Sequence, residues 1–133
     1  MGLVWSGATV DMDPSREATD RAMMTRCIEL SRLAVSEGEH PFGTVIALDG
    51  QVVAEAINRN IRDSDVTRHA EVIALSDAQK TISREQLRHC TLYTNVEPCA
   101  MWSYCTSRSL GRSGGLRYWV PSHGRAIEME HLA

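Results

Sequence analysis

The sequence predicts an α/β domain in which an N-terminal antiparallel hairpin is followed by alternating helices and strands. Two β-rich segments, 43–48 and 51–57, are joined by Asp49-Gly50, which is the strongest short signal for a tight hairpin turn. From residue 69 onward, segments with helical apolar spacing alternate with short apolar runs. Strands that alternate with helices pair in parallel, so we expect parallel pairing after the hairpin.

The predicted helices begin at recognisable start signals. Asp13-Pro14 combines a capping residue with the residue type favoured at a first helical position, and apolar residues continue at helical spacing until Gly38. The apolar run that follows His69 predicts a second helix, which ends near Lys80. We expect this second helix to be buried.

The remaining elements lie in the second half of the chain. We expect a strand over 90–95, a helix that begins at Pro98 and a strand from Leu116 to Val120. A short acidic segment over 127–130 then closes the chain. Residues 1–12 are expected to form a loose extension, and residues 13–133 a single domain.

Composition excludes several classes of function. The chain has 133 residues, 43% hydrophobic and 23% charged, which is ordinary for one soluble globular domain. It contains no long apolar run of the kind that crosses a membrane and no basic start followed by a secretory apolar stretch. The four cysteines show no disulfide spacing, so we expect Cys27 and Cys90 to be small buried apolar residues in a reducing cytoplasm.

The charge balance argues against binding to nucleic acid. The net charge is −3, whereas phosphate neutralisation needs clustered Lys and Arg. One basic stretch carries Arg108, Arg112 and Arg117 among serines and glycines. We interpret it as a solvated loop rather than an RNA-binding surface.

Two short motifs carry the chemistry. His69 and Cys99 are residue types that bind a catalytic zinc, which takes about three protein ligands and leaves one position open for water. Glu71, two residues after the histidine, would share the first turn of its helix and could act on zinc-bound water as a general base. Pro98 would place Cys99 in the first turn of the next helix, where the helix dipole favours a thiolate.

This pattern resembles the zinc-dependent cytidine, guanine and tRNA-adenosine deaminase superfamily, whose motifs are His-x-Glu and then Pro-Cys-x-x-Cys. The similarity extends to the hairpin that starts at Pro41 and to the strand-to-helix segment 91–101, and covers roughly residues 15 to 120. The resemblance implies a three-layer α/β/α cytidine-deaminase-like sheet. It also implies a homodimer and a C-terminus that is short for the family.

The resemblance assigns roles to individual residues. It implies that Glu71 is the catalytic base, that Asn58 contacts the substrate base, and that Glu97 lines the path of the departing amine. Asn58 could instead end its strand as a turn-forming residue. Phe42, the only phenylalanine, is either a wall of the substrate pocket or a core residue.

The chain departs from the family pattern at Trp102, where the second cysteine of Pro-Cys-x-x-Cys would stand. Residues three apart on a helix lie about 60° apart in angle and about 4.5 Å along the axis, so two thiolates there can share one ion. Cys105 lies six positions after Cys99, about 120° away and about 9 Å further along, and cannot replace the missing ligand on an unbroken helix. We expect Zn²⁺ to bind weakly or not at all.

Two function classes follow. The first is hydrolytic deamination of a nucleobase or nucleoside, with a purine such as guanine favoured and with activity reduced by the altered metal site. The second is a deaminase-fold protein that binds or regulates without catalysis. Retention of Glu71 favours the first class, and Trp102, whose side chain could fill the volume of a metal, favours the second.

Overall fold

The computed structural model describes residues 14–96, Cys99, Met101, Cys105, 116–120 and 125–128. The predicted extension over 1–12, and with it Glu97, Pro98 and Trp102, lies outside the described residues. None of the helices within the described part of the chain is both long enough and apolar enough to cross a membrane.

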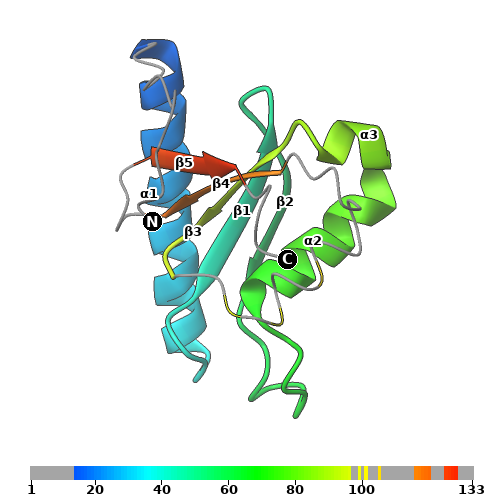
Figure 1. Ribbon diagram of the computed structural model, residues 1–133. Helices are drawn as coiled ribbons and strands as arrows, with labels where there is room; N and C mark the ends of the chain where they lie inside the picture. The colour runs from blue at the N-terminus through cyan, green and yellow to red at the C-terminus, as the bar shows by residue number, and fades with distance from the viewer. Residues whose placement is uncertain are drawn as a thin grey trace, which may run out of the picture.

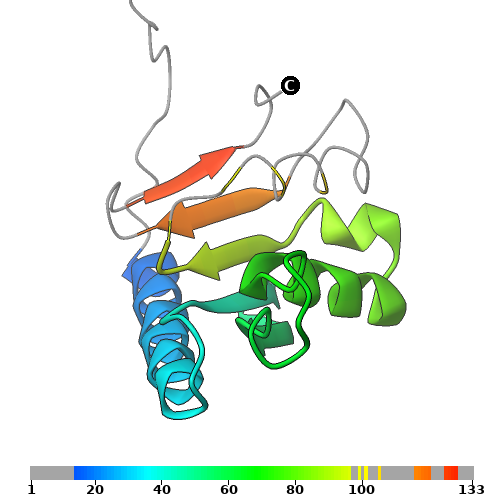
Figure 2. The same cartoon turned by 90° about the horizontal axis from the view of Figure 1, so that it is seen from below.

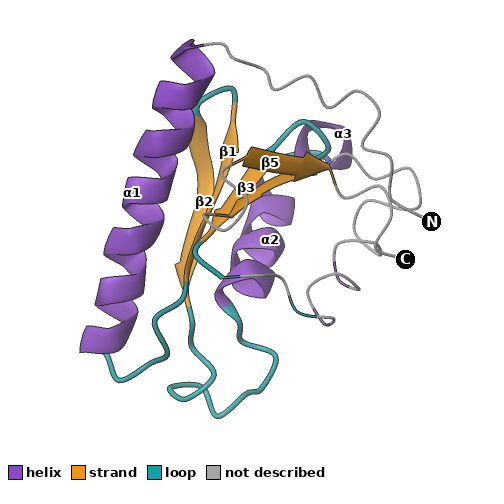
Figure 3. Cartoon of the chain, turned by 60° about the vertical axis from the view of Figure 1, so that its left-hand side comes forward, coloured by secondary structure: helices purple, strands orange, loops and turns teal. Residues whose placement is uncertain are grey.

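The described residues form three layers around one mixed sheet. In chain order the elements are α1 (Pro14–Ser36), β1 (Gly43–Leu48), β2 (Gln51–Ile57), α2 (Ala70–Thr81), α3 (Arg84–Leu87), β3 (Thr91–Thr94), β4 (Arg117–Val120) and β5 (Arg125–Glu128). The strands lie in the order β2-β1-β3-β4-β5. Helix α1 covers one face of the sheet and α2 covers the other (Figure 1 and Figure 3). The predicted three-layer α/β/α fold is confirmed.

The directions of the strands follow from two kinds of connection. β1 and β2 form the predicted hairpin, and Asp49 at its turn has a φ of 50° while Gly50 has a φ of 77°. β1 also pairs with β3 in antiparallel fashion, so β2 and β3 run in the same direction on either side of β1. Helix α2 lies in the crossover between those two strands.

The C-terminal strand corrects the sequence prediction. β3 and β4 pair in parallel, as expected. Residues Arg125–Glu128, however, form β5, which pairs with β4 in antiparallel fashion at the edge of the sheet, where we expected parallel strands and then an acidic tail (Figure 2). We did not predict this short strand because it includes the acidic residue Glu128 and was interpreted as an acidic tail. Strands at the edge of a sheet tolerate such charged residues.

Alternate residues of the central strands build two separate cores. Val45 and Tyr93 pack against the face of α1 that carries Cys27, while Ile46 and Leu92 pack against α2. Cys27 is completely buried in the first core, where its thiol donates to the carbonyl of Tyr93 over 3.2 Å. Because side chains alternate between the two faces of a strand, each core is fixed by the same register.

The buried cysteines behave as predicted. Cys27 and Cys90 are both completely buried and free of disulfides. Burial raises the pKa of the Cys27 thiol to about 12 and that of Cys90 to about 11. Both therefore act as small apolar residues at neutral pH.

Helix α1 packs unusually close to the start of β1. A Cβ atom placed on Gly43 would lie 2.7 Å from the carbonyl oxygen of Cys27 and 2.7 Å from the Cβ of Leu30. Only glycine allows this separation. The close contact fixes the first end of β1, which directly follows Phe42.

Candidate functional site

His69 lies at the N-cap of α2. We had expected it to lie within the first turn of that helix. Its backbone is extended, with φ −72° and ψ 147°, and its carbonyl accepts the first helical hydrogen bond, from Ile73 N over 3.0 Å. The imidazole makes no capping hydrogen bond to the helix. The ring is therefore available to residues outside α2.

The structure brings the His69 imidazole and the Cys99 thiol together. The distance from Cys99 Sγ to His69 Nδ1 is 3.6 Å, although the two residues are 30 positions apart in the chain. Both side chains are half-buried. A nitrogen and a sulfur donor at this separation form two corners of a site for a borderline-soft ion such as zinc.

Glu71 lies two residues after His69 in the chain and is almost completely buried. It occupies the first turn of α2, as predicted, and only 4% of its surface is exposed. Burial raises the pKa of its carboxyl, while its own backbone amide, the charge of His69 and a hydrogen bond with the Thr94 side chain each act to lower the pKa. A carboxylate held at a raised pKa is suited to accept a proton and return it.

The end of β3 anchors the opposite wall of this region. Asn95 Oδ1 accepts a hydrogen bond from Gly43 N over 3.0 Å, and Asn95 Nδ2 donates to the carbonyl of Pro41 over 2.8 Å. Phe42 is thereby held between two fixed backbone groups. Its side chain is half-buried and its ring centroid lies 6.2 Å from that of His40.

Asn58 is the most informative of the substrate-binding candidates. It follows β2, only 2% of its surface is exposed, and its backbone N–H donates to the carbonyl of Phe42 over 3.2 Å. Its side-chain Nδ2 donates to Asn60 Oδ1. Asn58 does not have the positive φ of a turn-forming residue, since the described non-glycine residues with positive φ are Asp49 and Ser64.

The side-chain oxygen of Asn58 is buried and has no hydrogen-bond partner among the described residues. A buried acceptor without a partner costs about 1–3 kcal/mol, so native structures rarely retain one without a reason. Thr44 Oγ1, on the neighbouring strand β1, is buried and unpartnered within the same part of the chain. Asn58 Oδ1 and Thr44 Oγ1 are therefore two buried polar atoms without a partner in the described part of the chain.

The described residues supply only part of a metal site. Among them, no three His, Cys, Asp or Glu side chains gather closely enough to hold a metal ion. The pair His69 and Cys99 therefore provides two ligands where a catalytic zinc takes about three. Cys105 packs, together with Cys99, against the core on the α2 side of the sheet.

Sequence reasoning did not find Thr94, Asn95 or Thr44. Thr94 and Asn95 act through partners that are distant in the chain, Glu71 and Gly43. Thr44 stands out only because its side-chain oxygen is buried without a partner among the described residues. Thr94 and Asn95 do stand at the end of a predicted strand, just before the Pro-Cys motif. Glu97, which the resemblance placed near the departing amine, lies beyond the residues that the structure describes.

Comparison with known proteins explains this arrangement. The model for the zinc-binding region of cytidine and deoxycytidylate deaminases matches residues 17–111, which include His69, Glu71, Cys99 and Trp102. The chain belongs to this family. Its deaminase ancestry, which the motifs predicted, is confirmed.

Individual relatives differ in the substrates for which they are named. A probable cytosine deaminase of Schizosaccharomyces pombe is 43% identical over 84 residues, which are 63% of this chain and 51% of the relative. The guanine deaminase structure from Bacillus subtilis is 37% identical, covers 67% of this chain and 57% of its own, and has a TM-score of 0.62. A structure from a study of A-to-I editing by tRNA:A34 deaminases is 31% identical, covers 75% of both chains and has a TM-score of 0.65.

This chain matches only part of its curated relatives. It spans about half the length of the curated relatives it matches, with 51%, 54% and 51% of three of them covered. Similarity to these relatives supports deaminase chemistry as a class. It does not assign a substrate.

Proposed function

We propose that this protein carries out hydrolytic deamination of a free nucleobase, with a purine such as guanine as the first candidate. The observation that carries the proposal is the position of Glu71, a buried carboxylate with a raised pKa beside the His69–Cys99 pair. Burying a carboxylate costs free energy, and the Thr94 hydrogen bond and the charge of His69 offset that cost only in part, since the pKa of Glu71 is still raised. A catalytic task explains why the sequence retains it.

Each residue would have a separate role. Glu71 would take a proton from the attacking water and pass it to the departing amine. The unpartnered oxygen of Asn58 would accept a hydrogen bond from an N–H of the base and hold the base in register. His69 and Cys99 would hold the zinc ion, which supplies a hydroxide at neutral pH when it is bound.

A second candidate function has its own support. Trp102 stands inside the matched residues 17–111, at the position where the family pattern has a zinc-binding cysteine. Together with a pair of metal ligands among the described residues, where a catalytic zinc takes about three, this favours a protein that binds a base through Asn58 but does not deaminate it. The two candidates differ in one measurable property, which is the release of ammonia.

The test combines metal content with ammonia release. We expect less than one equivalent of zinc per chain, and slow ammonia release from guanine that is lost in Glu71→Gln. Trp102→Cys should bring zinc close to one equivalent and raise the rate, whereas Trp102→Ala, which removes the bulk without adding a ligand, should do neither. Elemental analysis and an ammonia assay on the same samples measure both quantities.

The outcomes separate the candidates. Guanine binding without ammonia release, in the wild type and in Trp102→Cys alike, would support the binding protein. Adenosine, cytosine, cytidine and a tRNA should be assayed in parallel, because relatives of this chain include proteins named tRNA-specific adenosine deaminases. A faster reaction on tRNA than on any free base would overturn the choice of substrate.

A further inference from the structure

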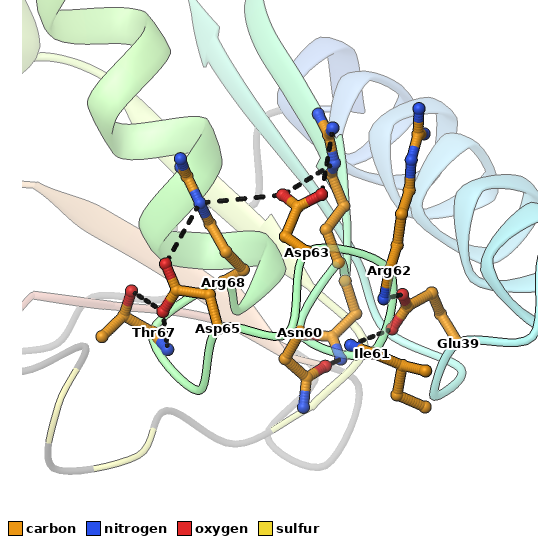
Figure 4. Close-up of polar contacts among 10 residues, drawn as sticks. Glu39, Asn60, Ile61, Arg62, Asp63, Asp65, Thr67 and Arg68 are labelled. Carbon is orange, nitrogen blue, oxygen red and sulfur yellow. Dashed lines mark hydrogen bonds and ion pairs between the residues drawn. The ribbon is translucent and has the colours of Figure 1, made fainter.

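The loop that joins Asn58 to His69 is held by a buried glutamate from another part of the chain. Glu39, in the segment between α1 and β1, is only 6% exposed. Its two carboxylate oxygens accept from consecutive backbone amides of the loop, Ile61 N over 3.2 Å and Arg62 N over 2.6 Å (Figure 4). Glu39 N in turn donates to the carbonyl of Ala34 in α1 over 2.9 Å, which ties the contact to the helix.

The loop is closed by contacts between its own ends. Arg59 N donates to the carbonyl of Arg68 over 2.9 Å, and Asp65 N donates to the carbonyl of Asn60 over 3.1 Å. The Asp63 carboxylate lies 3.4 Å from Arg59 Nε and 3.8 Å from Arg68 Nε (Figure 4). These ion pairs are exposed and contribute little free energy. They fix the shape of the loop rather than its place on the domain.

The residue next to the Glu39 contact is the one that orients Asn58. Asn60 Oδ1 accepts the hydrogen bond from Asn58 Nδ2, and Ile61 follows Asn60 directly. Since Asn58 Nδ2 is committed to Asn60, Asn58 Oδ1 is the atom left without a partner in the described structure. The position of the loop therefore decides which atom of Asn58 a ligand meets.

We propose that Glu39 is a positioning residue for the candidate base-binding site. Glu39 holds the 59–68 loop in place, and Asn60 of that loop binds the side-chain N–H₂ group of Asn58. The side-chain oxygen of Asn58 is then left to accept a hydrogen bond from a ligand. This inference rests on the proposed function for the identity of the ligand. It selects ligands that present an N–H donor to Asn58 Oδ1, as the ring N–H and exocyclic amine of guanine do. A ligand edge with acceptors alone would be rejected, because two acceptors would face one another.

A role for Glu39 that is limited to satisfying two backbone amides explains its contact with the loop less well. Ile61 and Arg62 are themselves exposed residues, so water would serve as a partner for their amides if the loop lay away from Glu39. A buried carboxylate is a costly way to satisfy them unless the loop must be held in one place. The contact also spans more than 20 positions of sequence, from Glu39 to Arg62, which local turn formation does not need.

The test compares Glu39→Gln with Glu37→Gln. An amide in place of the carboxylate keeps the shape but turns an N–H₂ group toward one of the loop amides, so one of the two hydrogen bonds is lost. Glu37 is exposed and lies two residues earlier, so its variant controls for the change of charge. Backbone and side-chain amide NMR spectra are recorded first without ligand and then during titration with guanine, on chelator-treated protein so that no turnover occurs.

In Glu39→Gln we expect faster exchange of the Ile61 and Arg62 amide protons, a shifted Asn58 side-chain amide resonance, and guanine affinity lowered by roughly ten-fold. Glu37→Gln should leave all three unchanged. Adding Asn58→Ala should abolish the effect of Glu39→Gln on guanine affinity, because the two act through one contact. If Glu39→Gln does not fold, Glu39→Asp, one methylene shorter, should show the same changes to a smaller degree.

Two results would overturn the inference. One is an Asn58 resonance and loop amides in Glu39→Gln that match those of the wild type. The other is unchanged guanine affinity in Glu39→Gln when the wild type binds guanine. If the wild type does not bind guanine, the proposed substrate fails, and the NMR spectra without ligand alone decide whether Glu39 positions Asn58.

Discussion

Buried polar groups of the α2 face concentrate where the family motifs meet. Glu71 is buried with a raised pKa, and Asn58 and Thr44 each keep a buried polar atom without a partner in the described structure. The core cluster on the same side of the sheet is built from apolar side chains, among them Ile46 and Leu92. Residues that break the packing rules in one region indicate that the region serves a function, because stability alone would not retain them.

Glu71→Gln is expected to stabilise the protein at neutral pH. Burial raises the pKa of Glu71 above the ordinary value of 4.5, so the folded state binds the proton more tightly than the unfolded state. Stability therefore falls as pH rises through the interval between the unfolded-state and folded-state pKa, and stays lower above it. Glutamine carries no charge and can still form a hydrogen bond with Thr94. The stability of Glu71→Gln should therefore not fall as pH rises through this interval.

Thermal unfolding of both proteins from acid to neutral pH measures the effect. The melting temperature of Glu71→Gln should exceed that of the wild type at pH 7, and the two should converge below about pH 4, where the carboxyl is protonated in both states. Glu37→Gln, at an exposed position, provides the control. A wild type that gains stability relative to Glu71→Gln as pH rises would contradict the burial argument.

At this scale the sequence proposes site residues only where they stand in recognisable short motifs. His69, Glu71 and Cys99 could be named because their types and spacing carry a zinc-hydrolase pattern. Glu39 and Asn95 could not be named, since each works through partners 22 to 54 positions away. No spacing rule connects such pairs before the fold is known.

At the scale of the elements, the contact between α1 and β1 leaves no room for a side chain at Gly43. Gly43→Ala is expected to destabilise the fold by about 1–3 kcal/mol, since the new methyl group would lie 2.7 Å from atoms of Cys27 and Leu30. Denaturant unfolding measures the free energy. Gly38→Ala is the matched control, because its Cβ would meet no atom within 4 Å and only its φ of 83° opposes the change.

Gly43→Ala should cost more than Gly38→Ala, for which about 1 kcal/mol is expected. Equal losses would mean that the α1 contact yields without strain. A larger loss in Gly38→Ala would mean that the left-handed backbone, and not the packing, dominates at this end of the sheet.

Element boundaries were predictable where a turn or cap residue marks them. The hairpin matched its expected bounds because Asp49-Gly50 fixes both the turn and the register. The short helix α3 was missed, although Ser83 and Gln86 form the capping box that its sequence displays. At four residues it is too short to show an apolar period.

At the scale of the molecule, both helical layers depend on one sheet. Leu92, in the middle of β3, is completely buried in the core on the α2 side. Leu92→Ala is expected to lower the free energy of unfolding by about 2–5 kcal/mol, whereas Val52→Ala, at a position 48% exposed on the edge strand β2, should change it by less than about 0.5 kcal/mol.

Since α1 and α2 pack on opposite faces of the same strands, we expect the loss to appear in one cooperative transition (Figure 3). Far-ultraviolet circular dichroism and tryptophan fluorescence should therefore report the same midpoint. Two separate midpoints in Leu92→Ala would show that the α1 layer survives without the α2 layer.

The overall topology was predictable only in part. Alternating helix and strand patterns gave the layers and the parallel β3–β4 pair. They did not show that β3 would lie beside β1 with β2 on the other side, because that choice depends on how α2 packs across the sheet. The homodimer stays a prediction from the family resemblance.

The hairpin turn at Asp49-Gly50 is a suitable position for attaching a label to the protein. It lies at the end of β1 opposite Gly43, about 17 Å of strand from the residues that hold Asn95 and Phe42. Both turn residues are exposed. A dye, an affinity tag or a surface-immobilisation linker attached there would point away from the candidate site, so ligand binding could be followed on a sensor without blocking it.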